Sequence, residues 1–139
     1  MAKLYRTILP VDDIERAATF YAQLLGAAGE RVSPGRHYFD CEGMILACYD
    51  PAADGDDEAP RPIPGPLYFA VDAIEETYRL CREAGARFST EVAPGIGAFG
   101  EIAARPWGET SFYVSDPFGN PLCFVARETA FRGGATDPE

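Results

Sequence analysis

Two segments of the chain carry apolar residues at the three- and four-residue spacing of an amphipathic helix. They cover residues 14–25 and residues 74–84. Each is followed by glycine and alanine, Gly26-Ala27 in one case and Gly85-Ala86 in the other. Glycine at this place closes a helix in a left-handed conformation. The pattern therefore predicts two helices of similar length, one in each half of the chain.

A similar five-residue sequence begins both helices. Val11-Asp12-Asp13-Ile14-Glu15 recurs as Val71-Asp72-Ala73-Ile74-Glu75. In both copies an aspartate stands three residues before a glutamate, which is the spacing of a capping box. We therefore expect Asp12 and Asp72 to accept a hydrogen bond from a free amide of the first turn.

Strand patterns repeat in the same way. Each half begins with an apolar run and later has a turn signal between two strand-like runs, which predicts a hairpin. The turn signals are Asp40-Cys41-Glu42-Gly43 and Asp116-Pro117-Phe118-Gly119. Each half thus reads as one strand, one helix and three strands. The second half is longer because it holds a glycine- and proline-rich segment, residues 94–108, which we expect to act as a lid.

These elements predict a single α+β domain that spans residues 1–139. It divides into module one (residues 4–50), a polar, proline-rich connector (51–65), module two (66–126) and a tail (127–139). The tail turns polar and glycine-rich, so we expect fraying from Gly133 to Glu139. A length of 139 residues, with 47% hydrophobic and 24% charged residues, fits one globular domain with its own core.

The formal net charge of −10 narrows the range of partners. Such a surface repels nucleic acid and anionic membranes, so we expect neither as a partner. No apolar run approaches the roughly 20 residues that span a bilayer. The first residues lack the apolar stretch and cleavage site of a secretory signal. The expected location is the cytoplasm.

The chain has four cysteines and a single histidine. No two cysteines form a Cys-x-x-Cys pair, so we expect free thiols that pack as small apolar groups. One histidine excludes any site that needs two histidine ligands. We expect this residue, His37, at the surface or at the rim of a pocket.

The repeated βαβββ unit and its motifs resemble the vicinal oxygen chelate superfamily, which includes glyoxalase I, bleomycin-resistance proteins, fosfomycin-resistance enzymes and extradiol dioxygenases. The resemblance covers about residues 4–125 and rests on Val11-Asp12-Asp13-Ile14-Glu15, Phe20-Tyr21, Leu25-Gly26, Val71-Asp72, Ala84-Gly85-Ala86, Trp107-Gly108-Glu109, Phe112-Tyr113-Val114 and Asp116-Pro117-Phe118-Gly119-Asn120-Pro121. It implies two modules that form a cupped, mostly antiparallel eight-stranded sheet with helices on its outer face. It also implies a homodimer, and the connector is long enough for modules to be exchanged between copies.

Members of this superfamily usually place metal ligands on the first and last strand of each half, facing into the cup. By internal symmetry, these positions hold Arg6 and Ala47 in module one, and Pro66 and Cys123 in module two. Arginine is a fixed cation, and alanine and proline side chains have no donor atom. One thiolate does not make a divalent site, which needs three or four ligands. We therefore predict that no metal and no other cofactor is bound.

Alternate strand residues share a face, which predicts the lining of the cup. Ile8 shares the face of Arg6, and Tyr49 that of Ala47, whereas leucines and phenylalanines on the opposite faces suit packing under the helices. The predicted ligand pocket comprises Arg6, Ile8, Tyr38, Ala47, Tyr49, Tyr68, Glu101, Trp107 and Cys123. Such a lining fits a flat aromatic or amphipathic organic ligand, although each single tyrosine has simple packing as its alternative role.

Two pocket residues have competing interpretations. Arg6 either holds a carboxylate or phosphate of a ligand, or has a structural role. In the structural role it pairs with an internal acid such as Glu101 or Glu109 or reaches solvent at the rim of the cup. Cys123 is either a buried structural thiol or a nucleophile activated by Arg6, with His37 as base. The structural interpretation is favoured for both residues.

Three functions are compatible with these features. The first is metal-independent binding or sequestration of a small organic molecule, as in bleomycin-resistance proteins, which needs no catalytic residue. The second is an enzyme with a non-standard site, either a glyoxalase-type lyase or isomerase or a dioxygenase-like enzyme, using Arg6, Cys123 or Glu101. The third is a regulatory or structural dimer with a vestigial pocket. We favour the first.

Overall fold

The computed structural model describes residues 1–133. Except for Gly133, the fraying predicted for the end of the tail lies outside the described residues. Among residues 1–133, no helix has the length and apolar sequence that a membrane crossing requires.

Module one forms a four-stranded sheet, which we call the first sheet. Its elements are β1 (Arg6–Pro10), α1 (Ile14–Leu25), β2 (Glu30–Ser33), β3 (Arg36–Cys41) and β4 (Met44–Tyr49). The strand order is β1-β4-β3-β2, with β1 parallel to β4 and the other pairs antiparallel. The predicted hairpin joins β3 to β4, and its two turn residues, Glu42 and Gly43, both have positive φ.

Module two repeats this order with an insertion. Its elements are β5 (Leu67–Val71), α2 (Ile74–Ala84), β6 (Arg87–Phe88), β7 (Val92–Ala93), β8 (Gly97–Ala98), β9 (Ala103–Ala104), β10 (Thr110–Ser115) and β11 (Pro121–Ala126). The second sheet has the order β5-β11-β10-β6, and β9 also pairs with β10. Strands β7 and β8 form a separate hairpin within the inserted segment. The short helices η1 (Ala52–Asp54) and η2 (Arg127–Thr129) lie in the connector and after β11.

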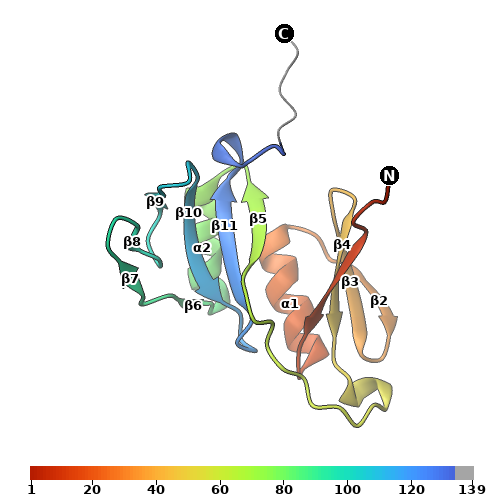
Figure 1. Ribbon diagram of the computed structural model, residues 1–139. Helices are drawn as coiled ribbons and strands as arrows, with labels where there is room; N and C mark the ends of the chain where they lie inside the picture. Colours follow the sequence, from red (N-terminus) through yellow and green to blue (C-terminus); the bar gives the residue numbers. More distant parts are fainter. Residues whose placement is uncertain (134–139) are drawn as a thin grey trace.

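The fold is therefore mixed α+β with two helices, as Figure 1 shows. Most strand pairs are antiparallel, and the parallel pairs are β1 with β4 and β5 with β11. Within residues 1–133 the strands form three sheets rather than one continuous eight-stranded sheet.

The predicted capping boxes are wrong in both helices. In α1 the cap is Asp13, whose carboxylate accepts a hydrogen bond from the Arg16 amide at 3.1 Å, so the helix begins one residue later than the capping box requires. In α2 the cap is Ala73, and no side chain among residues 1–133 caps the helix. Asp72 instead accepts a 2.6 Å hydrogen bond from Arg127, because an arginine within reach offers a charge-assisted bond. Both helices do end at the predicted glycines, Gly26 and Gly85.

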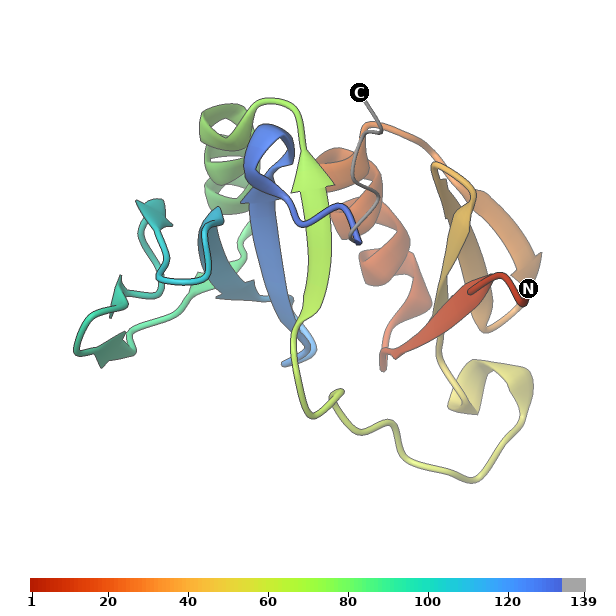
Figure 2. The same ribbon diagram turned by 45° about the horizontal axis from the view of Figure 1, so that its top comes forward.

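One hydrophobic core joins the two modules. Residues from the helix-covered faces of both sheets and from both helices form a single buried cluster, which includes Leu9, Leu46, Leu122 and Phe124. This confirms the faces predicted to pack under the helices. Figures 1 and 2 both place α1 between β5 and the first sheet. The opposite face of each sheet, which we call its open face, therefore lies outside the shared core.

The Asp116 turn fixes module two to module one. The Asp116 carboxylate is buried and accepts a 2.5 Å hydrogen bond from the Tyr21 hydroxyl of α1. It also accepts hydrogen bonds from the backbone amides of Phe118 and Asn120. The Asn120 side chain in turn donates to the carbonyl of Pro10. The aspartate and asparagine of this turn thus hold the modules together.

Candidate functional site

Five of the predicted pocket residues lie together on the open face of the first sheet. Strand register pairs Ile8 with Ala47 and Ala47 with Tyr38, which places their side chains on one face. Arg6 and Tyr49 lie two residues along their strands from Ile8 and Ala47, on the same face. Ile8, on the edge strand β1, is 57% exposed and leaves a large apolar side chain uncovered on this face.

Arg6 contacts aromatic groups. Its Nη1 donates a 2.9 Å hydrogen bond to the Tyr38 hydroxyl. Its guanidinium lies 5.5 Å from the centre of the Tyr38 ring and 5.3 Å from that of Tyr5, both within cation–π range. Its ion pair with Glu101 or Glu109, which the sequence left open, is absent from the described residues. The exposed guanidinium is thus positioned by aromatic rings and keeps its charge available.

The connector covers one end of this face. The Arg36 guanidinium lies 4.5 Å from the centre of the Tyr49 ring. Arg36 also pairs with Asp54, which accepts hydrogen bonds from the Ser33 hydroxyl and the Gly35 amide as well. The connector therefore attaches to the β2–β3 turn through Asp54, and it limits the open face at Tyr49.

The open face of the second sheet is aromatic. Register pairs Tyr68 with Cys123 and Cys123 with Tyr113. The Tyr68 and Tyr113 rings meet edge to face with centroids 6.3 Å apart, and Phe99 lies 5.1 Å from Tyr113. Tyr68 is 58% exposed, whereas Cys123 beside it is fully buried. These rings provide a surface on which a flat molecule can stack.

Burial raises the pKa of the Cys123 thiol to about 11, although hydrogen bonds with Tyr113 and Ser111 partly offset the effect. The thiol is therefore protonated at neutral pH. Because the thiolate is the nucleophile, this burial disfavours the nucleophilic form of Cys123. The other three cysteines are free thiols as predicted, and Cys48 and Cys81 are fully buried.

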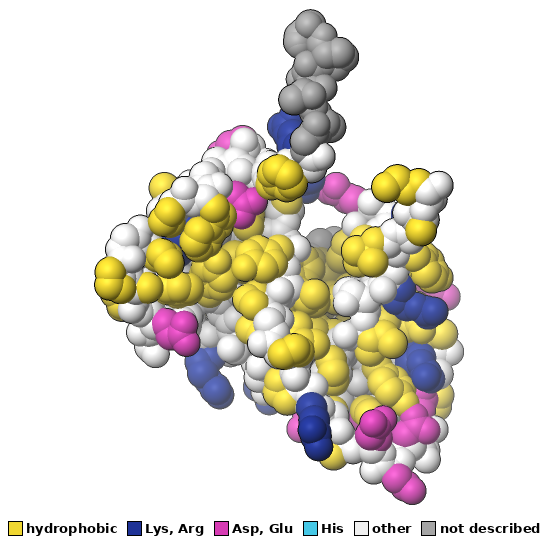
Figure 3. All heavy atoms as spheres, in the orientation of Figure 1, with side chains coloured by type: hydrophobic (Ala, Val, Ile, Leu, Met, Phe, Trp, Pro, Cys, Tyr) yellow, Lys and Arg dark blue, Asp and Glu magenta, His cyan; other side chains and the backbone are white. Residues whose placement is uncertain are grey.

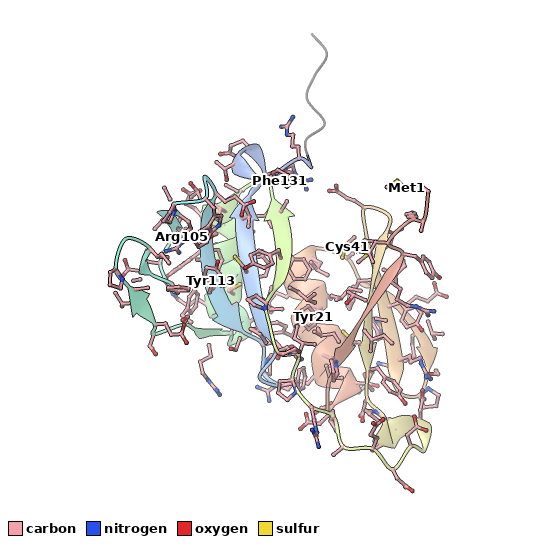
Figure 4. The ribbon with its side chains drawn as sticks, in the orientation of Figure 1. Met1, Tyr21, Cys41, Arg105, Tyr113 and Phe131 are labelled. Atoms are coloured by element: carbon pink, nitrogen blue, oxygen red, sulfur yellow. The ribbon has the colours of Figure 1, made fainter. Side chains whose placement is uncertain are left out.

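Arg105 was missed in the sequence, where a lone arginine among alanines, proline and tryptophan follows no periodic pattern. It is only 4% exposed and lies over the open face of the second sheet, beside Phe99 and Tyr113 (Figure 4). It donates to the Ser111 hydroxyl and to the carbonyls of Ile96, Ala98, Phe99, Glu101 and Ser111. These hydrogen bonds hold the segment that was predicted to act as a lid, and they favour a fixed wall of the open face over a moving lid.

Two predicted pocket residues lie on this held segment. Trp107 is half exposed in the turn that follows β9. Glu101 is exposed, and it is its backbone carbonyl that contacts Arg105. Neither residue lies next to Arg6 within one chain. Arg6 is on the open face of the first sheet, and the shared core separates this face from the open face of the second sheet.

His37 is not at the surface, so that prediction is wrong. It is 8% exposed and lies on the helix-covered face of β3, next to Phe39. Its Nε2 lies 2.9 Å from the carbonyl of Ala28, and Nδ1 accepts a hydrogen bond from Arg31. Because Nδ1 accepts and Nε2 faces a carbonyl, the neutral Nε2–H tautomer satisfies both contacts. His37 is therefore structural.

The positions at which the resembled superfamily binds metals do not fit a metal here. Arg6, Ala47 and Pro66 offer no ligand side-chain atom, and the single thiol of Cys123 does not make a divalent site, which needs three or four ligands. Across residues 1–133, no three side chains of His, Cys, Asp or Glu come together in a way that could hold an ion.

A cavity of about 520 Å³ lies between the modules, and we call it the inter-module cavity. Its wall is mainly apolar and comes from the end of α1, the helix-covered face of the first sheet and the edge strand β5: Leu24, Leu25, Phe39, Leu46, Leu67 and Phe69. Figure 3 shows the hollow between the two halves of the molecule. Of the nine predicted pocket residues, only Tyr68 lines it.

Comparisons with known proteins agree with this architecture. Residues 3–124 match the family model of the glyoxalase/bleomycin resistance protein/dioxygenase superfamily. A glyoxalase-related enzyme from Fulvimarina pelagi is 22% identical, with a TM-score of 0.71 over 99% of this chain and 96% of that one. The oxidase ChaP-H1 is 27% identical, with a TM-score of 0.67 over 91% and 97%.

A superfamily member from Sphaerobacter thermophilus is 24% identical, with a TM-score of 0.64 over 91% of this chain and 98% of that one. No curated protein sequence is significantly similar to the chain.

Proposed function

The chain belongs to the glyoxalase/bleomycin resistance protein/dioxygenase superfamily, and we propose that it binds or sequesters a small aromatic or amphipathic organic molecule without a metal. The donor set carries this proposal. The four positions where the superfamily holds its metal have an exposed guanidinium, a methyl group, a proline ring and a buried thiol. Binding requires complementary shape and chemistry but no ligated ion, which is what these residues offer.

The ligand site that we propose is a cup made by two copies of the chain. The open face of module one from one protomer meets the open face of module two from its partner. Each face is incomplete alone: Ile8 and Tyr68 are both more than half exposed. The strands β1 and β5 also end their sheets, each with one neighbour, so both have a free edge that another strand can cover. In a homodimer, the partner would cover both the exposed side chains and the free strand edges.

The two faces favour a particular ligand chemistry. Module two contributes the rings of Tyr68, Tyr113 and Phe99, which suit stacking on a flat ring system. Module one contributes Arg6, whose guanidinium can hold a carboxylate or phosphate in a bidentate manner. The proposed ligand is therefore a planar molecule with an acidic group.

An enzymatic role is the second candidate, and the likeness to the oxidase ChaP-H1 at 27% identity favours it. In that case the chain acts on the molecule that it binds in the cup, as a lyase, isomerase or dioxygenase-like enzyme with a non-standard site. The buried, protonated Cys123 thiol speaks against covalent catalysis at that position.

Native mass spectrometry of the purified protein tests the proposal. We expect a dimer that carries an organic molecule of a few hundred daltons, identified by its exact mass after denaturation. The variant Tyr68→Ala should lose this molecule, whereas Val92→Ala, on the exposed β7–β8 hairpin, should retain it. A monomer, or a dimer whose bound molecule does not depend on Tyr68, would contradict the proposed cup.

A further inference from the structure

The inter-module cavity is distinct from the open face of the first sheet, and of the residues assigned to the proposed cup it shares Tyr68. The strand β1 divides the cavity from this face, because neighbouring residues of a strand point to opposite faces. Thr7 faces the cavity, and Arg6 and Ile8 beside it lie on the open face. The cavity therefore remains without a role in the function proposed above.

The interior of this cavity suits an apolar molecule. Its volume of about 520 Å³ lies within the roughly 300–1,000 Å³ of small-molecule pockets. Phe39 and Leu46 contribute from the first sheet, Leu24 and Leu25 from α1, and Phe69 from β5. Apolar walls on three sides favour a compact hydrocarbon body, since its transfer from water removes apolar surface on both partners.

The rim of the cavity is charged and links the two modules. Arg127 donates to Asp72 at 2.6 Å and to both carboxylate oxygens of Glu42, at 2.8 and 3.2 Å. Glu42 comes from the β3–β4 turn and Asp72 from the end of β5, so Arg127 bridges the modules. Asp40 also lies at the rim. Arg127 thus pairs with two carboxylates, whereas Asp40 accepts a hydrogen bond from the Gly43 amide. The Lys3 ammonium lies beside Gly43 in the same turn, so three carboxylates face two cations and the rim keeps a small negative excess.

We propose that the inter-module cavity is a second binding site, which takes a small apolar molecule with a cationic head, such as a hydrophobic amine. The apolar body lies against Phe39, Leu46 and Phe69. The ammonium group lies at the rim, where Glu42, Asp72 and Asp40 attract it. A carboxylate in the same place meets the net negative rim.

Two fluorescent probes that share one apolar ring system test the ligand class. Dansylcadaverine carries an amine and dansylglycine carries a carboxylate. We expect saturable binding of dansylcadaverine with a blue-shifted emission, at least tenfold tighter than the binding of dansylglycine. Equal binding of the two probes, or no saturable binding of the amine, would overturn the proposal.

Cys41 reports where the probe binds. It lines the cavity and is partly exposed, whereas the other three thiols are fully buried. Saturating dansylcadaverine should slow the alkylation of Cys41 by N-ethylmaleimide at least fivefold, measured by peptide mass spectrometry. An unchanged rate at full occupancy would place the probe elsewhere and contradict the proposal.

Blocking variants complete the test. Thr7→Phe fills the cavity from β1, and Ala27→Trp obstructs its rim from an exposed position that folding tolerates. Both should weaken dansylcadaverine binding at least tenfold, whereas Val92→Phe adds the same bulk on a remote hairpin and should leave it unchanged. Normal binding in Ala27→Trp would overturn the proposal.

Because Tyr68 lines both sites, Ala27→Trp and the protection of Cys41 distinguish the cavity from the cup. A ligand that depends on Tyr68→Ala but not on Ala27→Trp supports the proposed function and leaves the cavity to be judged by the amine probe alone.

Discussion

Arg105 shows what a single residue does for the open face of module two. A buried guanidinium without an acidic partner is costly unless all its donors are used. Here one hydroxyl and five carbonyls surround it. Lysine cannot replace this arrangement, because its three donors radiate from one nitrogen whereas the guanidinium is a planar fork.

Arg105→Met should therefore destabilise the protein by about 3 kcal/mol, since several buried carbonyls lose their partner. Urea unfolding followed by circular dichroism measures this change. Arg79→Met is the matched control: Arg79 makes exposed ion pairs with Glu76 and Glu83, so its loss should have little effect. Equal effects of the two substitutions would show that the contacts of Arg105 do not stabilise the fold.

For single residues, the sequence predicted the face of the sheet better than it predicted the hydrogen-bond partners. Alternation along strands correctly placed Ile8 with Ala47 and Tyr68 with Cys123, because the period of two is a local property of the backbone. It could not find Arg105, whose partners are backbone carbonyls of an irregular segment. It also misplaced His37, because one polar side chain can be buried wherever a carbonyl and a donor are in reach.

The helices illustrate the same limit at the scale of elements. Their length and their ends at Gly26 and Gly85 follow from spacing and from the backbone freedom of glycine. Their first turns depend on which aspartate reaches a free amide. Asp13 does so in α1, and the Asp72 carboxylate pairs with the distant Arg127, a contact that no local pattern contains.

Substitution of the adjacent aspartates before α1 tests this assignment. Asp13→Ala should lower the free energy of unfolding by about 1 kcal/mol, as expected for the loss of an N-cap. Asp12→Ala should change it much less, because the Asp12 side chain is not the cap. The midpoints of urea unfolding distinguish the two. A larger effect of Asp12→Ala would support the predicted capping box, with Asp12 as the cap.

In the whole molecule, two sheets enclose the helices in a shared core, and each sheet leaves an aromatic face outside it. The Tyr21–Asp116 hydrogen bond and the Arg127 ion pairs hold the modules in this arrangement. The sequence repeat predicted both modules, since each is built from local patterns. How the modules sit relative to each other depends on Asp116, Asn120 and Arg127, whose partners lie in the other module.

The buried acidic groups predict how stability depends on pH. Burial raises the pKa of the Cys48 and Cys81 thiols to about 12 and that of Cys123 to about 11, from an ordinary value of 9.0. Burial and the nearby Asp116 also raise the pKa of Tyr21. In the unfolded chain these groups have lower pKa values and therefore lose their protons at lower pH. Their contribution to the stability is complete below about pH 9 and is lost as the pH rises through the folded-state pKa values.

Thermal unfolding between pH 7 and pH 11 checks this dependence. The melting temperature should be nearly constant up to about pH 8.5 and should then fall steadily. Cys48→Ala should reduce the steepness of the fall, because it removes one of the shifted groups. A melting temperature that rises between pH 9 and pH 11 would contradict the burial of these side chains.

The central claim is that the cup of this superfamily member works without a metal. The most direct measurement is isothermal titration of the purified, chelator-treated protein with nickel, zinc, manganese and iron(II). The affinity for the co-purified organic molecule is measured before and after the addition of each metal. We predict no stoichiometric metal binding and an unchanged affinity. Binding of one ion per chain that strengthens the affinity for the organic molecule would contradict the account and would return a metal to the site.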